Sequence, residues 1–299
     1  MPLTAAETAA ARRLIDLALA EDLGSAGDVT SFATIPVDTP GRAAVVARAA
    51  GVVAGLPIAE LVCAAVDPAL TIKPAVADGA AVQAGAELAT VAGPMRSILT
   101  AERTVLNFLQ RLSGVATLTR RYVEAAGGKA QVLDTRKTTP GWRLLEKYAV
   151  RMGGGHNHRV GLYDGILIKD NHLWALGGGT AAVPKAVAAA REHAPGLPIE
   201  VEVESSEQFE AALACRPDIV LLDNMSLELL RRCVARRNEV APGVLLEASG
   251  GVGLQTIGPI AATGVDRVSV GALTHSATAL DIALDYRPAA GYPRSGSSR

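Results

Sequence analysis

A concentration of basic residues between Asp134 and His172 is the part of this sequence that most directly indicates chemistry. Three runs carry it: Asp134-Thr-Arg-Lys-Thr-Thr-Pro-Gly141, Gly153-Gly-Gly-His-Asn-His-Arg159 and Lys169-Asp-Asn-His172. Their basic side chains are Arg136, Lys137, His156, His158, Arg159, Lys169 and His172. Interleaved glycines and turn formers are typical of a pocket that binds several negative charges with side chains and exposed main-chain N–H groups. A solvated basic helix would repeat Lys or Arg at helical spacing.

Four of these cations are expected to bind a ligand. Arg136, Lys137, Arg159 and Lys169 fall on strand ends or on loops flanked by glycine. Arginine can bind a carboxylate or phosphate through two parallel hydrogen bonds, whereas lysine acts as a compact charge. His156 and His158, two residues apart on a predicted loop, could hold a metal. No cysteine or third histidine lies close by, so a zinc site is not predicted.

Two other basic features are predicted to be ordinary surface. Arg143, Lys147 and Arg151 follow one another at intervals of four on a predicted helix that also carries Glu146. This spacing predicts a solvated face. Arg103, on the predicted helix 100–112, is likewise predicted to be a surface arginine when it is judged from the sequence alone.

Carboxylates lie on one face of a predicted strand. In Glu200-Val-Glu-Val-Glu204 the alternation places Glu200, Glu202 and Glu204 on the same side. A carboxylate that points into a covered parallel sheet must be paired, or must bind a cation or a ligand hydroxyl. Asp223 ends the next strand and could share the site. Alternatively, Asp223-Asn224 caps the helix that starts near Ser226.

Two glycine loops indicate a phosphate site. Glu247-Ala-Ser-Gly-Gly-Val252 and Ser269-Val-Gly-Ala-Leu273 each follow a predicted strand. Glycine loops allow close approach of phosphate and present N–H groups to it. In α/β barrels, two adjacent late strands with such loops form a common phosphate site.

The elements that must position these residues repeat a strand–loop–helix unit from about residue 130. The predicted strands are Gln131–Asp134, Gly165–Lys169, Ile199–Val203, Ile219–Leu222, Val244–Ala248 and Arg267–Val270. The predicted helices are Ala181–His193, Ser206–Ala214, Ser226–Arg237 and Thr256–Ala262. This alternation predicts parallel βα units.

A barrel is favoured over an open doubly wound sheet. Polar or glycine residues stand at nearly every predicted strand end: Asp134, Lys169, Asp223, Ser249 and Gly271. The active site of an α/β barrel is built from these ends, whereas an open sheet concentrates its chemistry at one switch point. A complete barrel of this class has eight strands, and only six are predicted here, so the sequence does not decide whether the barrel closes.

The first 115 residues have a different pattern. An amphipathic helix is predicted over Ala5–Ala20, β-like runs over Gly41–Arg48, Leu70–Pro74 and Leu88–Val91, and a helix over Thr100–Leu112. The turn pattern from Asp78 to Leu88 resembles a biotinyl/lipoyl-type β-sandwich, but without a lysine hairpin for a prosthetic group. The predicted domains are therefore residues 1–115, residues 116–275, and a C-terminal helix with a flexible tail over residues 276–299.

Composition limits the classes of protein. The chain has 299 residues, 49% hydrophobic and 20% charged, with a formal net charge of −1. A nucleic-acid or anionic-membrane binder would usually be basic. No apolar run approaches the ~18 residues of a membrane span, and no signal peptide is evident. Three widely spaced cysteines suggest neither disulfides nor a metal site, so a reduced, cytoplasmic setting is predicted.

The ordered motifs together resemble the quinolinate phosphoribosyltransferase family over almost the whole chain. Motifs of the first part are Glu21-Asp-Leu-Gly…Gly27-Asp-Val-Thr30 and Ala101-Glu-Arg-Thr…Asn107-Phe-Leu. The three basic runs, Lys147-Tyr-Ala-Val150, the glutamate strand, Leu221-Leu-Asp-Asn224 and both glycine loops continue the match. The resemblance implies an N-terminal α/β sandwich, an open, incomplete α/β barrel, and a homodimer whose active sites are completed by the partner's Arg103. Further assembly to a hexamer stays open.

The resemblance also implies roles for individual residues. Arg103, Arg136, His158, Arg159 and Lys169 would bind the quinolinate carboxylates, and Lys137, Glu202 and Asp223 would be the catalytic group. Glu202 and Asp223 would hold the ribose of phosphoribosyl pyrophosphate and its Mg²⁺. The remaining predicted substrate contacts are Thr135, Ser249, Gly250, Gly251, Val270, Gly271 and Ala272.

Three alternatives stay open at the level of sequence. One is a transferase that uses nicotinate or another aromatic acid without decarboxylation. Another is the molybdenum-transport-associated paralogue, which shares the fold and many motifs. The third is a non-enzymatic binding module, which the lipoyl-like turn would suggest but which would not need an acidic pair beside a phosphate loop.

Overall fold

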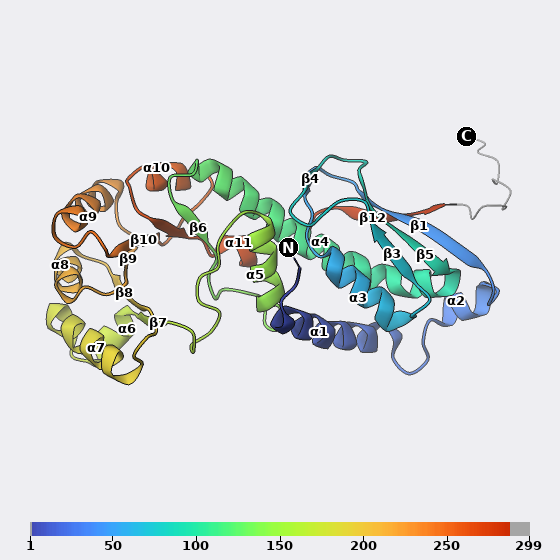
Figure 1. Cartoon of the computed structure of the whole chain (residues 1–299), viewed down its shortest axis with the longest axis horizontal. Helices are drawn as coiled ribbons and strands as arrows, with labels where there is room; N and C mark the ends of the chain where they lie inside the picture. Colours follow the sequence, from blue (N-terminus) through green and yellow to red (C-terminus); the bar gives the residue numbers. More distant parts are fainter. Residues whose placement is uncertain (1, 288–299) are drawn as a thin grey trace. The chain divides into compact units, whose positions relative to one another are not determined.

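The computed structural model describes residues 2–287, and these residues form two compact units. The first unit consists of residues 2–119, 139–154 and 277–287, and the second of residues 120–138 and 155–276. Figure 1 shows the elements of each. This division differs from the predicted boundaries near 115 and 275, because residues 139–154 belong with the first unit. Local sequence does not reveal such a return of the chain.

The first unit contains an antiparallel sheet with the strand order β12-β1-β5-β3. The strands are β1 (Pro40–Ala47), β3 (Thr71–Pro74), β5 (Glu87–Pro94) and β12 (Ile282–Arg287). The short strands β2 (Gly51–Val52) and β4 (Ala81–Val82) form a separate antiparallel pair, and β4 lies in the lipoyl-like turn.

Strand β12 corrects one prediction. Ile282–Arg287 pairs with β1 in the register Ala47↔Ile282 to Arg42↔Arg287, where a C-terminal helix was predicted. The predicted helix is therefore wrong for the described residues, and the predicted tail at 288–299 lies outside them. The physical reason is that β1 would otherwise be a sheet edge with unpaired N–H and C=O groups.

The helices of the first unit are α1 (Ala5–Leu23), α2 (Val29–Thr34), α3 (Leu56–Val66), α5 (Arg143–Met152) and most of α4 (Met95–Ala126), whose residues 120–126 are counted with the second unit. The start of α1 is fixed by a capping box in which the Glu7 N–H donates to Thr4 Oγ1 at 3.2 Å and the Thr4 N–H donates to Glu7 Oε2 at 2.8 Å. Helix α4 begins earlier and ends later than predicted.

Helix α5 is not the solvated basic helix that was predicted. Lys147 is 2% exposed and Glu146 is fully buried. Arg151 lies over the ring of Tyr148 and forms an ion pair with Glu7 of α1 at 2.6 Å. The charges do recur at helical spacing, as predicted, but the face that carries them is not solvated. Helix α1 packs against α5 and supplies partners for these charges that no local sequence pattern shows.

The second unit contains a six-stranded parallel sheet with the order β6-β11-β10-β9-β8-β7. Its strands are β6 (Gln131–Leu133), β7 (Ile166–Ile168), β8 (Ile199–Val203), β9 (Ile219–Asp223), β10 (Leu245–Ser249) and β11 (Arg267–Ser269). Its helices are α6 (Asp170–Ala175), α7 (Gly179–His193), α8 (Ser206–Cys215), α9 (Leu227–Val240), α10 (Ile257–Ala261) and α11 (Ala272–His275). Helices α7, α8 and α9 lie outside the curved row of strands (Figure 1).

This strand order is that of a barrel cut open between β6 and β7. From β7 to β11 each strand lies beside the next in the chain, and β6 follows β11, so the order never reverses as it does at the switch point of a doubly wound sheet. The predicted α/β class with an open, incomplete barrel of about six parallel strands is confirmed. Because the strands are parallel, the C-terminal ends of all six lie at the same edge of the sheet.

The first unit also holds a buried ionic cluster around Glu146. Its Oε1 accepts from Arg111 Nη2 at 2.5 Å and from Thr139 Oγ1 at 3.0 Å, and its Oε2 accepts from the Thr139 N–H at 3.1 Å. Arg111 also donates to the carbonyl of Ala277 at 2.9 Å. The cluster therefore ties together α4, α5 and the segment that leads to β12.

Glu146→Gln should destabilise the protein by about 2–4 kcal/mol, because it leaves a partly buried arginine without its counter-charge. Urea unfolding followed by circular dichroism measures the change in the free energy of unfolding. Glu210→Gln is the matched control, because Glu210 forms an exposed pair with Arg236 at 2.9 Å, and such pairs contribute only about 0–1 kcal/mol. Equal effects of the two substitutions would contradict this prediction.

Candidate active site

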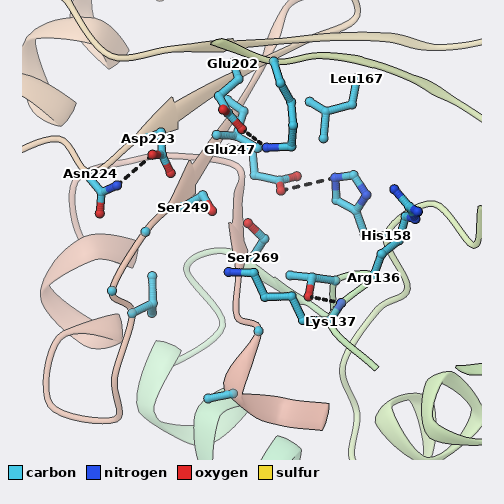
Figure 2. A pocket seen from close by; sticks show the side chains of 18 of the residues that line it. Arg136, Lys137, His158, Leu167, Glu202, Asp223, Asn224, Glu247, Ser249 and Ser269 are labelled. Atoms are coloured by element: carbon cyan, nitrogen blue, oxygen red, sulfur yellow. Dashed lines mark hydrogen bonds and ion pairs between the residues drawn. The ribbon is translucent and has the colours of Figure 1, made fainter. Parts of the chain in front are cut away.

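A pocket of about 740 Å³ opens at the C-terminal ends of the strands in the second unit. Figure 2 shows its side chains, which come from the loops and ends of β6 to β11. The volume is in the range of small-molecule sites. Of the predicted site residues, the following line it: Thr135, Arg136, Lys137, His158, Arg159, Lys169, Glu202, Asp223, Ser249, Gly250, Gly251, Gly271 and Ala272.

The acidic side of the pocket comes from three neighbouring strands. In the sheet register Glu202 of β8 is level with Leu221 of β9, which is level with Glu247 of β10. Two residues further along these strands, Asp223 of β9 is level with Ser249 of β10. Parallel register thus gathers carboxylates that are far apart in sequence. Glu202 is 7% exposed and forms an ion pair with Lys169, whereas Glu204 is exposed.

The basic side holds two arginines close to each other. Burial lowers the pKa of Arg159, and so does the nearby charge of Arg136, while Glu200 opposes this shift. Arg159 Nη1 donates to the carbonyl of Gly165 at 3.0 Å. The buried Arg136 Nε has no hydrogen-bond partner in the described structure. Like charges held together in this way provide a site for an anion with more than one negative charge.

Beneath these arginines His158 lies between two buried carboxylates. Its Nε2 is 2.9 Å from Glu200 Oε2 and 3.4 Å from Glu247 Oε1. Burial lowers the pKa of His158, whereas its contacts with Glu200 and Glu247 and their negative charges raise that pKa. The main-chain N–H of Arg159 points at Nδ1 from 2.8 Å, which opposes a second proton on the ring. Both influences place a proton on Nε2.

The three groups of this cluster also lie within ligand reach of one another, since their nearest donor atoms are all within 4.8 Å. The hydrogen bond at Nδ1 does not fit a metal site. A histidine that binds metal through Nε2 usually donates a proton from Nδ1 to an acceptor. Here Nδ1 of His158 faces the N–H of Arg159 and acts as the acceptor.

Asp223 is held by its neighbour instead of capping a helix. Asn224 Nδ2 donates to Asp223 Oδ2 at 2.7 Å (Figure 2). The Asn224 N–H donates to the carbonyl of Ser249 at 2.9 Å. The cap of α9 is Ser226, whose side chain accepts from the Leu229 N–H. The alternative prediction of a helix cap is therefore wrong, and Asp223 lines the pocket instead.

The glycine loop after β10 depends on the same asparagine. Gly250 has φ +93°, and a Cβ at this position would lie 2.2 Å from Asn224 Oδ1. Only glycine fits beside this side chain without displacing it. After β11, Gly271 similarly leaves room for the Lys137 side chain, whose Cδ would be 3.1 Å from an added Cβ. Thr274 Oγ1 fixes the Lys137 loop by donating to its carbonyl at 2.8 Å.

Two predicted site residues are not among the residues that line the pocket. Val270 is 1% exposed and donates its N–H to the carbonyl of Leu133, so it supports the loop from behind. Arg103 belongs to the first unit and is exposed on α4. Asp134 has a supporting role as well, because Oδ1 accepts the His158 N–H at 2.9 Å and Oδ2 accepts from Asn157 at 2.6 Å.

Several lining residues were not predicted as site residues: Leu167, Leu221, Asn224, Glu247, Val252, Ser269 and His275. A signal existed for Glu247, which interrupts the apolar strand Val244–Ala248 and is fully buried. The reasoning that selected Glu202 applies to it equally. Leu167, Leu221 and Val252 carry no chemical signal in the sequence, because apolar residues of this kind fill every core.

The arrangement can bind two anionic ligands side by side. One end offers paired arginines, and the other offers carboxylates for hydroxyls next to glycine loops for a phosphate. Mg²⁺ prefers carboxylate oxygens together with ligand phosphates. Glu202 and Asp223 are therefore the residues that fit such an ion.

Gly250→Ala should weaken binding of inorganic phosphate or pyrophosphate by about ten-fold or more, because a displaced Asn224 misplaces both the loop and Asp223. Isothermal titration calorimetry measures the affinity. Gly196→Ala is a matched control, since Gly196 also has φ +93° but nothing within 4 Å of the added Cβ. It should cost stability through backbone strain alone. Equal loss of affinity in both variants would contradict this account of Gly250.

Comparison with known proteins agrees with this geometry. The family model of the quinolinate phosphoribosyl transferase C-terminal domain matches residues 115–285, and that of the N-terminal domain matches residues 28–113. The nicotinate-nucleotide pyrophosphorylase [carboxylating] of Mycobacterium leprae is 49% identical over 279 residues, covering 92% of this chain and 97% of that protein. Quinolinate phosphoribosyltransferase [decarboxylating] 1b of Nicotiana tabacum is 43% identical, covering 91% of this chain and 81% of that protein.

A solved structure agrees as well. The nicotinate-nucleotide pyrophosphorylase from Francisella tularensis superposes with a TM-score of 0.87 at 40% identity, covering 93% of this chain and 96% of that one. None of the helices in residues 2–287 is long and apolar enough to cross a membrane. Two family models that together span most of the chain, and relatives that it matches over 81–97% of their length, lead to one conclusion: the chain belongs to the quinolinate phosphoribosyltransferase family.

Proposed function

We propose that this chain transfers the phosphoribosyl group of phosphoribosyl pyrophosphate to the ring nitrogen of quinolinate and releases CO₂, giving nicotinate mononucleotide and pyrophosphate. The observation that carries the proposal is a single pocket in which paired arginines face an acidic pair with a glycine loop. Family membership supports the same reaction. In the cell this would be a step of de novo NAD biosynthesis, in the cytoplasmic setting predicted from the cysteines.

The acceptor end would hold quinolinate through its two carboxylates. Arg136 and Arg159 can each bind a carboxylate with two parallel hydrogen bonds. Lys169 lines the same pocket and forms an ion pair with Glu202. When both substrates are present, Lys169 would share its charge between that carboxylate and the acceptor.

The donor end would hold phosphoribosyl pyrophosphate through its ribose and 5′-phosphate. The N–H groups of Ser249, Gly250 and Gly251, and of Gly271 and Ala272, would receive the phosphate. Glu202 and Asp223 would accept hydrogen bonds from the ribose hydroxyls and would hold Mg²⁺ through the pyrophosphate. A bound Mg²⁺ would offset the charge that develops on the leaving group.

The reaction would proceed by positioning and electrostatics, without a covalent enzyme intermediate. As the bond from C1′ to pyrophosphate breaks, positive charge develops on the ribosyl centre, and Glu202 and Asp223 favour that charge. Lys137, between the two ends, would stabilise the departing oxygen. The ring nitrogen of quinolinate then bonds to C1′. The resulting cationic ring accepts the electron pair of the C2–carboxylate bond, CO₂ leaves, and a proton replaces it at C2.

Each active site would be completed by a second copy of the chain. The described pocket contains no residue of the first unit, and Arg103 is exposed there. In the proposed homodimer, Arg103 of one chain would approach the quinolinate bound to the other. Whether dimers assemble into a hexamer does not affect this contact.

The activity is tested by incubating purified protein with quinolinate, phosphoribosyl pyrophosphate and Mg²⁺. Nicotinate mononucleotide and CO₂ should appear in equal amounts, and nicotinate in place of quinolinate should react poorly. Equal use of nicotinate would favour the transferase that does not decarboxylate. Absence of turnover with either acceptor would favour the paralogue or a binding module.

Arg136→Ala or Lys169→Ala should raise KM for quinolinate by roughly ten- to a hundred-fold, since each removes a charge-assisted hydrogen bond. KM for phosphoribosyl pyrophosphate should change less for Arg136→Ala than for Lys169→Ala, because only Lys169 is paired with Glu202. Steady-state kinetics measure both constants, with Arg236→Ala on the outer surface as the control. Unchanged kinetics in either variant would remove that residue from the site.

Mixing two inactive variants tests the shared site. An Arg103→Ala chain keeps an intact barrel, and a Lys137→Ala chain keeps an intact Arg103. Random reassociation should restore about a quarter of the wild-type activity, because half of the dimers are mixed and each has one complete site. If Arg103 served the barrel of its own chain, no mixture would regain activity.

A further inference from the structure

The cluster of Glu200, His158 and Glu247 has features that a simple carboxylate-binding histidine would not need. Glu200 is 3% exposed and Glu247 is fully buried. Neither oxygen of Glu247, nor Oε1 of Glu200, has a hydrogen-bond partner in the described structure. Buried carboxylates without full hydrogen bonding are costly. Two of them below an anion-binding pocket require a physical reason, because their charge would repel the substrate.

Both ring nitrogens of His158 are engaged by the protein. Nε2 faces the two carboxylates at 2.9 and 3.4 Å, and Nδ1 faces the main-chain N–H of Arg159 at 2.8 Å. Figure 2 shows Glu247 directed toward the ring of His158. A ring held in this way has no free edge nitrogen with which to bind a substrate carboxylate directly.

Resting on the proposed function, we infer that Glu247 and Glu200 are positioning residues of the acceptor end. They hold the proton of His158 on Nε2, so that the ring fixes the main chain of Arg159 and thereby the direction of its guanidinium group. His158 would thus act through Arg159 and would not be a direct ligand of quinolinate.

The two carboxylates would also stabilise the pocket before substrate arrives. Arg136 lowers the pKa of Arg159, which is the sign of repulsion between like charges, and Glu200 opposes that effect. Burial raises the pKa of Glu200, as does the charge of Glu247, while His158 and Arg267 oppose the rise. Asp134 faces the same loop through the main-chain N–H of His158. The cluster therefore sits among cations that it partly neutralises.

The ring can be observed directly in the full-length protein. Long-range ¹H–¹⁵N correlation spectra report the protonation of each imidazole nitrogen, and a His158→Gln variant identifies the signal. We expect Nε2 to be protonated and Nδ1 to be unprotonated at neutral pH, as the contact of Nδ1 with the Arg159 N–H requires. Glu247→Gln should shift part of the ring population to the tautomer with its proton on Nδ1, because it removes one of the two negative charges that hold the proton on Nε2.

Kinetics supply the second measurement. Glu247→Gln should raise KM for quinolinate by about ten-fold and leave KM for phosphoribosyl pyrophosphate nearly unchanged. Glu204→Gln, on the same strand as Glu200 but exposed, is the control and should match the wild type. A general folding defect would change both KM values and the thermal midpoint, so the two KM values separate the two causes.

Each outcome decides the inference. A proton on Nδ1 of His158 at neutral pH, or a balance between the two tautomers that does not respond to Glu247→Gln, would overturn it. A large shift of the Nδ1 or Nε2 signal on addition of quinolinate would show direct binding and would also overturn it. The spectra of the free protein do not depend on turnover, so failure of the proposed reaction would be recognised separately.

Discussion

The candidate active site depends on keeping several charges inside a parallel sheet. Carboxylates on buried strands are tolerated only when cations or ligand groups lie against them. Here Glu202 faces Lys169, and Glu200 and Glu247 face His158. The same pairs hold cations at the C-terminal ends of the strands, where a dianionic ligand can reach them. Charge balance and ligand binding are therefore provided by the same residues.

The barrel order is what allows this balance. Glu202, Asp223 and Glu247 stand on three successive strands, whose parallel register brings them to neighbouring levels. The cations come from the loop after β6, from the segment before β7 and from the end of β7, and β6 and β7 are the two edge strands of the opened barrel. The cations and the carboxylates thus come from different βα units, and no single segment could supply both signs at these distances.

Small main-chain features complete the donor end. Asn224 joins the carboxylate of Asp223 to the carbonyl of Ser249, and Gly250 fits beside it only because it lacks a Cβ. A positive φ of +52° at Asn224 is a conformation that asparagine adopts more readily than most residues. The side chain of Asn224 thereby couples Asp223, which is proposed to bind the ribose, to the loop of Ser249 and Gly250, which is proposed to bind the 5′-phosphate.

The sequence by itself determined the class of fold, the six strands and most of the residues that line the pocket. Strand and helix periods are local, and charged or glycine residues at strand ends stand out against apolar runs. Glu202, Asp223, Lys169 and the glycine loops were all identifiable in this way. Arg103 and the dimer were implied only by resemblance to a family, because no local pattern separates an interface arginine from a surface one.

Only the tertiary structure decided which charges face each other. The burial of Lys147, the return of residues 139–154 to the first unit and the strand at Ile282–Arg287 all result from contacts between distant segments. Likewise, Glu247 could be recognised as unusual in the sequence, but its proximity to His158 could not. The physical reason is that pairing energies of buried charges depend on distances of a few ångströms, and the sequence carries those distances only through the complete fold.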